Sequence, residues 1–136
     1  MKQDTPAPAD GPRAGGAAAS AAAARIRSYY ELVDRSDLPG LLNLFAPDAE
    51  YFRPGYAPIV GREQLTDFYR NQRIIRRGTH TVDVLVEQGS RIAVRGRFRG
   101  ELRDGREVAL AFSDFFELAP DGAIVRRDTY FFAPLA

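Results

Sequence analysis

The second half of the chain alternates between hydrophobic and polar residues with a period of two. Successive strand side chains point to opposite faces of a sheet, so this pattern predicts strands with one apolar face. Tight turns at Gln88-Gly89-Ser90, Asp104-Gly105 and Pro120-Asp121-Gly122 separate the segments and predict hairpins. The predicted strands are the segment from His80 to Glu87, then 92–102, 108–116 and 124–132.

One position interrupts this alternation. In the segment 108–116, Asp114 falls on the face that otherwise carries Val108, Leu110, Phe112 and Phe116. An isolated buried charge is too costly to keep, so this carboxylate must be paired, hydrogen-bonded or neutral. Two interpretations follow: a structural acid paired with an arginine such as Arg127 on the last strand, which stays ionised, or a neutral polar group in a pocket. In the first strand, the side chains expected on the apolar face are His80, Val82, Val84 and Val86.

The first half of the chain has helical spacing. Hydrophobic residues three and four apart predict an amphipathic helix over 19–35 that buries Ile26, Tyr29, Tyr30 and Val33. Asp37 is a suitable N-cap for a short second helix that buries Leu38, Leu41, Leu42, Leu44 and Phe45 and ends at 46–48. A third helix is predicted over 62–75, after a short strand at 50–52 and a turn-rich loop at 53–58. Its buried side is expected to carry Leu65, Phe68, Tyr69 and Ile75.

These elements predict one α+β domain. Residues 1–16 are rich in proline and glycine and bury too little apolar surface to offset the entropy of ordering, so we expect a disordered tail over 1–18 and a domain over 19–136. Helices followed by hairpin-linked strands predict a curved antiparallel sheet wrapped around three N-terminal helices.

Composition narrows the possible chemistry. The 19 basic and 18 acidic residues nearly cancel, which is untypical of a nucleic-acid-binding protein. The chain has no cysteine and one histidine, which excludes thiol chemistry and metal sites built from several histidines. It shows no apolar run long enough to span a membrane and no signal-peptide pattern, so we expect a cytoplasmic protein.

Several segments resemble the nuclear-transport-factor-2-like (NTF2-like) superfamily, which includes ketosteroid isomerases and SnoaL-like polyketide cyclases. The segments that carry the resemblance are Tyr29 to Ala49, Pro54 to Gly61 with the helix ending at Phe68-Tyr69, Ser113 to Phe116, and Asp121-Gly122-x-Ile124. The resemblance implies a conical pocket between the concave sheet face and the helices, and a homodimer. It is weak evidence for one function, because this fold hosts isomerases, cyclases, dehydratases, epoxide hydrolases and noncatalytic binders.

Position by position, the ketosteroid isomerase pattern is matched in part. Tyr29 matches the tyrosine of that family's oxyanion hole, and Asp114 matches its second donor, a carboxylic acid kept protonated by an apolar site. The family's catalytic aspartate precedes a proline, and Arg53 occupies that position here. An arginine is always protonated and cannot act as a base.

The resemblance and the residues together predict a small-molecule enzyme. We expect a cofactor-free isomerisation or cyclisation of a hydrophobic carbonyl-bearing substrate such as a polyketide, with Asp114 and Tyr29 as donors and His80 as the base, since histidine alone titrates near neutrality without perturbation. Arg53 is expected to clamp an anion or carbonyl beside Tyr56. The remaining expected pocket residues are Phe98, Phe112, Phe116, Arg127 and Phe131.

Other interpretations remain open. Tyr29 and Asp114 fit structural roles as well as a pocket role, and the same pocket fits a noncatalytic module that binds an apolar ligand. An epoxide-hydrolysing relative fits the fold but needs a cluster of acids around a water. In a third interpretation the chain is a dimeric interaction domain that uses the sheet face carrying Arg97 and Arg99.

Overall fold

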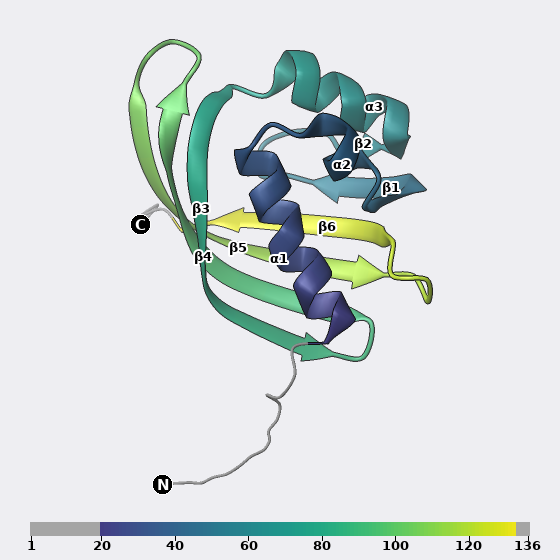
Figure 1. Ribbon diagram of the computed structural model, residues 1–136. Coiled ribbons are helices and arrows are strands. Elements are labelled where there is room, and N and C mark those ends of the chain that lie inside the picture. Colours follow the sequence, from purple (N-terminus) through teal and green to yellow (C-terminus); the bar gives the residue numbers. More distant parts are fainter. Residues whose placement is uncertain (1–19, 133–136) are drawn as a thin grey trace, which may run out of the picture.

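The computed structural model describes residues 20–132. A six-stranded sheet curves around the helices, and helix α1 lies across its concave face (Figure 1). The elements are α1 (Ala21–Asp34), α2 (Leu38–Leu42), β1 (Phe45–Phe52), β2 (Ile59–Val60), α3 (Gly61–Asp67), the π-helical turn η1 (Phe68–Gln72), β3 (Ile75–Gln88), β4 (Arg91–Leu102), β5 (Glu107–Leu118) and β6 (Ile124–Phe131). The predicted α+β fold class is confirmed, and the predicted disordered tail over 1–18 lies outside the described residues.

The four long predicted strands form consecutive antiparallel pairs in the sheet order β2-β1-β6-β5-β4-β3. The pair of β1 and β6 is parallel, which the prediction of a purely antiparallel sheet did not include. This pairing places Tyr51 opposite Arg127. It therefore joins a strand from the first half of the chain to the last strand. Within residues 20–132, no helix is long and apolar enough to cross a membrane.

Helix α1 confirms the predicted amphipathic face. Ser20 caps its N-terminus by accepting a 2.9 Å hydrogen bond from the Ala23 amide. The predicted apolar residues Ile26, Tyr29, Tyr30 and Val33 are all buried. The Ser20 hydroxyl also donates to Glu87 of β3 at 2.6 Å, so both the buried face and this contact hold α1 against the sheet.

Helix α2 is shorter than predicted. Asp37 caps it as expected, but the helix ends at Leu42 and leaves Leu44 and Phe45 outside. Strand β1 begins at Phe45, well before the predicted strand start at residue 50. The Leu44 carbonyl accepts a hydrogen bond from the Ile124 amide, and this long-range pairing favours an extended chain over another helical turn.

The third predicted helix is also shorter. It consists of α3 and η1, ends at Gln72, and leaves Ile75 to begin β3. The π-helical turn buries Phe68 and packs the adjacent ring of Tyr69 against it, with ring centroids 4.9 Å apart.

Strand β3 carries a bulge that changes its inward face. Val82 pairs with Gly96, whereas Val84 pairs with Arg95, so Asp83 has no partner residue on β4. An extra residue in one strand reverses which side chains face the core beyond it. Val84 and Val86 are therefore exposed, contrary to the prediction, while the neighbouring Leu85 packs against the core.

Candidate functional site

A cavity of about 490 Å³ opens between the concave sheet face and η1. Its hydrophobic lining residues are Val33, Pro54, Phe68, Ile74, Ile75, Phe98, Leu102, Val108, Leu110, Phe112, Phe131 and Phe132. Its polar and ionisable lining residues are Tyr29, Tyr51, Arg53, Tyr56, Tyr69, Gln72, Arg73, His80, Arg127 and Thr129. A largely apolar cavity with a few convergent polar groups is typical of a small-molecule site.

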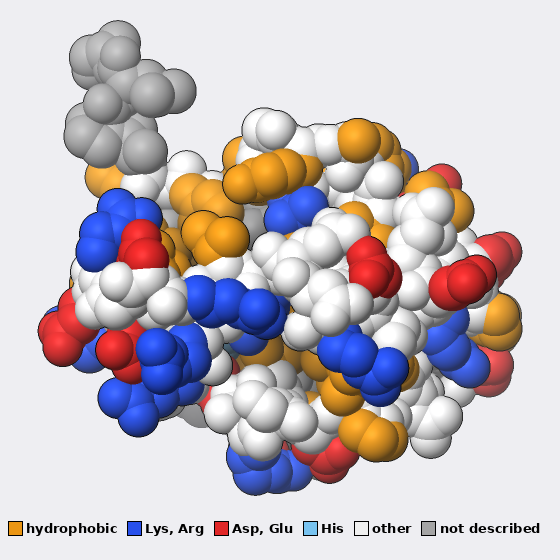
Figure 2. All heavy atoms as spheres, turned by 90° about the horizontal axis from the view of Figure 1, so that it is seen from above, with side chains coloured by type: hydrophobic (Ala, Val, Ile, Leu, Met, Phe, Trp, Pro, Cys, Tyr) orange, Lys and Arg blue, Asp and Glu red, His pale blue; other side chains and the backbone are white. Residues whose placement is uncertain are grey.

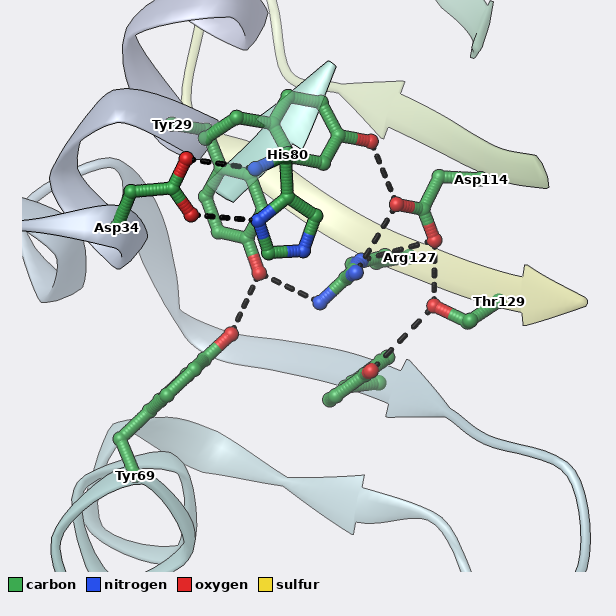
Figure 3. A network of polar contacts seen from close by, with 9 residues as sticks. Tyr29, Asp34, Tyr69, His80, Asp114, Arg127 and Thr129 are labelled. Atoms are coloured by element: carbon green, nitrogen blue, oxygen red, sulfur yellow. Dashed lines mark hydrogen bonds and ion pairs between the residues drawn. The ribbon is translucent and has the colours of Figure 1, made fainter. Parts of the chain in front are cut away.

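Asp114 lies behind the wall of this cavity and is completely buried. Arg127 donates to its two carboxylate oxygens, from Nε at 3.1 Å and from Nη2 at 2.9 Å. Tyr30 donates a further hydrogen bond at 2.5 Å, and Thr129 donates another. Four donor atoms from two elements, α1 and β6, therefore converge on one carboxylate (Figure 3).

This arrangement matches the first of the two interpretations of Asp114, a structural acid paired with Arg127. Its oxygens accept from neighbouring protein groups, and Asp114 is not among the residues that line the cavity. Burial lowers the pKa of Arg127, but the Asp114 carboxylate together with Tyr29, Tyr51 and Tyr69 outweighs burial, and the pKa of Arg127 lies well above its ordinary value. Asp114 therefore holds Arg127 in the wall of the cavity. It does not make the expected contact with a ligand oxygen.

Tyr29 and Tyr69 form the polar floor of the cavity. Their hydroxyl oxygens are 2.5 Å apart, and Arg127 donates from Nη1 to the Tyr29 hydroxyl. Burial raises the pKa of Tyr29 well above its ordinary value, and the positive charge of Arg127 reduces that rise only in part. Tyr29 therefore stays protonated and can act as a hydrogen-bond donor.

His80 is held by the last residue of α1. Its Nδ1 lies 2.6 Å from Asp34 Oδ1, and its backbone amide donates to Asp34 Oδ2 at 2.8 Å. The ring packs against Tyr30 and Phe98, with centroids 5.2 and 4.7 Å away. A carboxylate on Nδ1 favours the tautomer with its proton there, which leaves Nε2 as an acceptor on the ring edge away from Asp34 (Figure 3).

Arg53 lies where β1 ends and the turn-rich loop begins. Its guanidinium carbon is 4.2 Å from the centre of the Tyr56 ring and 4.4 Å from that of Phe68. Both Arg53 and Tyr56 line the cavity, as expected. Figure 2 shows this end of the molecule, where basic and hydrophobic side chains lie close together.

Most of the expected site residues line one cavity. Tyr29, His80, Arg53, Tyr56, Phe98, Phe112, Arg127 and Phe131 all belong to its wall. Phe116 does not, because its ring is buried in the core and packs edge-on against Tyr29 and Tyr30. Alternation alone cannot separate core from cavity, since both lie on the same face of the strand.

Sequence reasoning missed several residues of the site. Tyr69 was expected only as a core residue of the third helix, and Tyr30 only as a core residue of the first. Asp34 carried no signal, because an acidic residue at the end of a helix is ordinary on a solvated surface. Within residues 20–132, no group of three or more histidine, aspartate or glutamate side chains is arranged to hold a metal ion.

Solved structures share this architecture. An NTF2-like protein of unknown function from Burkholderia pseudomallei has 27% sequence identity and a TM-score of 0.77, over 84% of this chain and 92% of that chain. A putative polyketide cyclase from Pseudomonas putida has 20% identity and a TM-score of 0.75, over 84% and 93%. A Mycobacterium tuberculosis protein in complex with estradiol-17β-hemisuccinate has 20% identity and a TM-score of 0.72, over 84% and 95%.

The family assignment comes from the sequence itself. The model of the SnoaL-like domain matches residues 26–127, which include most of α1, the whole of β3, β4 and β5, and Arg127. The structures above share the fold that this match implies. The chain therefore belongs to the SnoaL-like domain family of the NTF2-like superfamily.

Proposed function

We propose that this protein catalyses a cofactor-free proton transfer, an isomerisation or cyclisation, on a hydrophobic small molecule with a carbonyl group, such as a polyketide. The observation that carries the proposal is a histidine oriented by a carboxylate, lining the same cavity as a pair of hydroxyls held by a buried arginine. A base and a preorganised oxygen-binding group are the two parts that enolisation requires.

The hydroxyl pair leaves one hydrogen for a ligand. Tyr29 and Tyr69 share one hydrogen bond, so one of their two hydroxyl hydrogens is used in that bond. The other remains available whichever tyrosine is the donor. Because Arg127 donates to the Tyr29 oxygen, it polarises this pair and strengthens its donation to an oxygen that gains negative charge.

In the proposed reaction, the ligand carbonyl oxygen accepts from the Tyr29 and Tyr69 pair. His80 Nε2 removes a proton from the carbon next to the carbonyl, and the electron pair moves to the oxygen to form an enolate. Where a carbon–carbon double bond adjoins that carbon, the enolate is a dienolate, and return of the proton from His80 to its far end completes an isomerisation. Alternatively, attack of the enolate carbon on a second carbonyl of the same molecule closes a ring, and the new alkoxide oxygen takes the proton back from His80. Asp34 orients the imidazole, and Asp114 positions Arg127.

The comparisons support this class of ligand. One structural relative is described as a putative polyketide cyclase, and another was solved with a steroid ester. Both ligand types are hydrophobic and carry oxygen substituents. Epoxide opening is less well supported, because no Asp or Glu among the described residues lines the cavity to activate a water.

Exchange of deuterium into 2-tetralone tests the proposal without knowledge of the natural substrate. This bicyclic ketone is hydrophobic and enolisable, and proton NMR in D2O follows loss of the signal next to its carbonyl. The wild-type protein should accelerate exchange, and His80→Gln should slow the catalysed rate about 100-fold, as expected for loss of a general base. Asp34→Asn should slow it about tenfold.

Arg76→Gln is a matched control, since Arg76 is exposed on β3 and does not line the cavity. It should exchange at the wild-type rate. Full exchange activity in His80→Gln would exclude this residue as the base. If 2-tetralone binds and the wild-type protein does not accelerate exchange, the chain is a noncatalytic binding module.

A further inference from the structure

We infer that the ligand of this cavity is a hydrophobic organic anion whose negative group is bound by Arg53 and Arg73. The inference rests on the proposed function only in that both concern the same cavity. It adds the charge of the ligand and the orientation of the ligand in the cavity.

The first observation is the charge of the cavity wall. Arg53, Arg73 and Arg127 line it, and no aspartate or glutamate among the described residues does. Asp114 neutralises Arg127 from behind the wall at 2.9 Å. Asp34 lies behind His80, so three arginines of the wall stand against the two carboxylates that contact it, before any charge on His80 is counted. Glu63 and Asp67 line the adjoining hollow that Arg53 also borders, outside this cavity. An anionic ligand would balance this excess positive charge.

The second observation is the surroundings of Arg53. The guanidinium lies against the rings of Tyr56 and Phe68, which shield it from water. Its Nε is buried and has no hydrogen-bond partner among residues 20–132. A buried guanidinium N–H without an acceptor is costly, and a carboxylate can supply paired acceptors to the planar fork of Arg53.

Arg73 brings a second positive charge to the same side. Its guanidinium carbon lies 5.9 Å from the centre of the Tyr69 ring, and Arg53 lies 4.4 Å from that of Phe68. The Phe68 and Tyr69 rings are only 4.9 Å apart. Within the described part of the chain, neither arginine forms an ion pair with a carboxylate. Both cations therefore lie beside η1, on the same side of the cavity.

The positions of the polar groups also define how the ligand is oriented in the cavity. The Tyr51 ring lies 4.5 Å from the Arg127 guanidinium carbon and 5.9 Å from that of Arg53, so polar groups continue along one wall from the floor outward. Phe98, Leu110 and Phe112 from β4 and β5 supply apolar parts of the lining. A ligand with its carbonyl at the Tyr29 and Tyr69 pair would place an anionic group at Arg53 and Arg73.

Two fluorescent probes test the charge preference directly. Anthracene-2-carboxylate and anthracene-2-carboxamide have the same ring system and nearly the same size, and they differ in charge. Fluorescence titration of the wild-type protein should give a dissociation constant at least about tenfold lower for the carboxylate, a difference of about 1.4 kcal/mol. Added salt should reduce this preference, because ions screen the interaction.

Variants assign the preference to the two arginines. Arg53→Gln and Arg73→Gln should each weaken carboxylate binding about tenfold and leave carboxamide binding unchanged, and Arg53→Lys should restore part of the loss. Arg76→Gln, which removes an exposed arginine of β3, should bind both probes as the wild type does. Equal wild-type affinity for the two probes would overturn the inference, as would an equal loss of both in Arg53→Gln and Arg73→Gln.

The same titration separates this inference from the proposed function. If the carboxylate is preferred and 2-tetralone exchange is not accelerated, the cavity binds anions without the proposed chemistry. If exchange depends on His80 and the two probes bind equally, the proposed function stands and the anion preference is wrong. Leu110→Trp, which fills the cavity, should abolish binding of both probes and confirms where they bind.

Discussion

At the scale of single residues, Asp114 shows how a buried charge is kept. Its carboxylate has no solvent exposure, yet it accepts from Arg127, Tyr30 and Thr129. Burying two charges is costly, and their mutual attraction offsets this cost only when the remaining lone pairs are also satisfied. The two additional hydroxyl donors meet that condition, so Arg127 can stay charged inside the wall of the cavity.

Removal of Asp114 should therefore destabilise the fold. Asp114→Ala leaves Arg127 buried without its partner, and we expect unfolding free energy to fall by about 3 to 5 kcal/mol. Urea denaturation followed by circular dichroism measures this loss. The double variant Asp114→Leu with Arg127→Met should recover part of it, because neither charge remains. An Asp114→Ala protein as stable as the wild type would show that the ion pair does not stabilise the fold.

The buried tyrosines predict instability at alkaline pH. Burial raises the pKa values of Tyr29, Tyr30 and Tyr51 above the ordinary value for tyrosine, and Asp114 raises that of Tyr30 further. In the unfolded chain these groups ionise near pH ~10, so the stabilisation is present below that pH and is lost as pH rises above it. Each tyrosine contributes a slope of about 1.4 kcal/mol per pH unit.

Urea denaturation at a series of pH values from 9 to about 11.5 measures this slope. Tyr51→Phe should reduce it, since one ionising group is removed. Absorbance at tyrosinate wavelengths should show the buried tyrosines ionising only as the protein unfolds. Ionisation of all tyrosines in a protein that keeps its folded circular dichroism spectrum would contradict this account.

At the scale of elements, glycines shape the part of the sheet that holds His80. The Phe98 ring lies over Gly78 and Gly100, and a Cβ built at Gly78 would lie 2.3 Å from it. No real contact is that short, so the close approach of ring and strand requires glycine. The same ring lines the cavity and packs against His80 with centroids 4.7 Å apart. A glycine on β3 thus helps to position the proposed base.

Gly78→Ala should displace the Phe98 ring and lower unfolding free energy by about 1 to 3 kcal/mol, the usual cost of overpacking. Combination with Phe98→Leu should relieve much of this loss. Relief should be smaller for Gly100→Ala, because a Cβ there lies 2.4 Å from the Arg77 carbonyl oxygen, closer than the 2.8 Å between a Cβ at Gly78 and the Arg99 carbonyl oxygen. Urea denaturation of Phe98→Leu, the two glycine variants and the two double variants gives the coupling energies, and purely additive losses would contradict a role for the ring.

At the scale of the whole molecule, the two faces of the sheet have different surroundings. Its concave face and α1 enclose the core and the cavity (Figure 1). Its outer face exposes Phe115 and Tyr130, which stack edge to face with ring centroids 5.8 Å apart. Exposed aromatic pairs of this kind are typical of protein interfaces.

We therefore predict that the protein is a homodimer that uses this outer face. Light scattering coupled to size-exclusion chromatography should give twice the mass of 15.1 kDa at micromolar concentration. Phe115→Arg should shift the equilibrium toward the monomer without loss of folding, because it places a charge among apolar contacts. Arg106→Gln, at an exposed pair with Asp104 in the turn between β4 and β5, is the control. A monomeric wild-type protein at all accessible concentrations would refute the prediction.

Local pattern was sufficient for much of this fold. The amphipathic face of α1, the long strands, their hairpins and the place of Asp114 on the apolar face are confirmed. These features follow from side-chain periodicity and turn chemistry, which act between neighbours in the chain. The residues of the cavity wall were identified largely from the resemblance to a family, since that resemblance carries tertiary information.

The tertiary structure alone decided the remaining features. The parallel pairing of β1 with β6, the bulge at Asp83 and the partnership of Asp34 with His80 join residues far apart in sequence. The choice between a pocket acid and an ion pair for Asp114 also depended on which donors surround it. The sequence shows which side of a strand is buried, but burial beside an arginine and burial beside a cavity give the same local pattern.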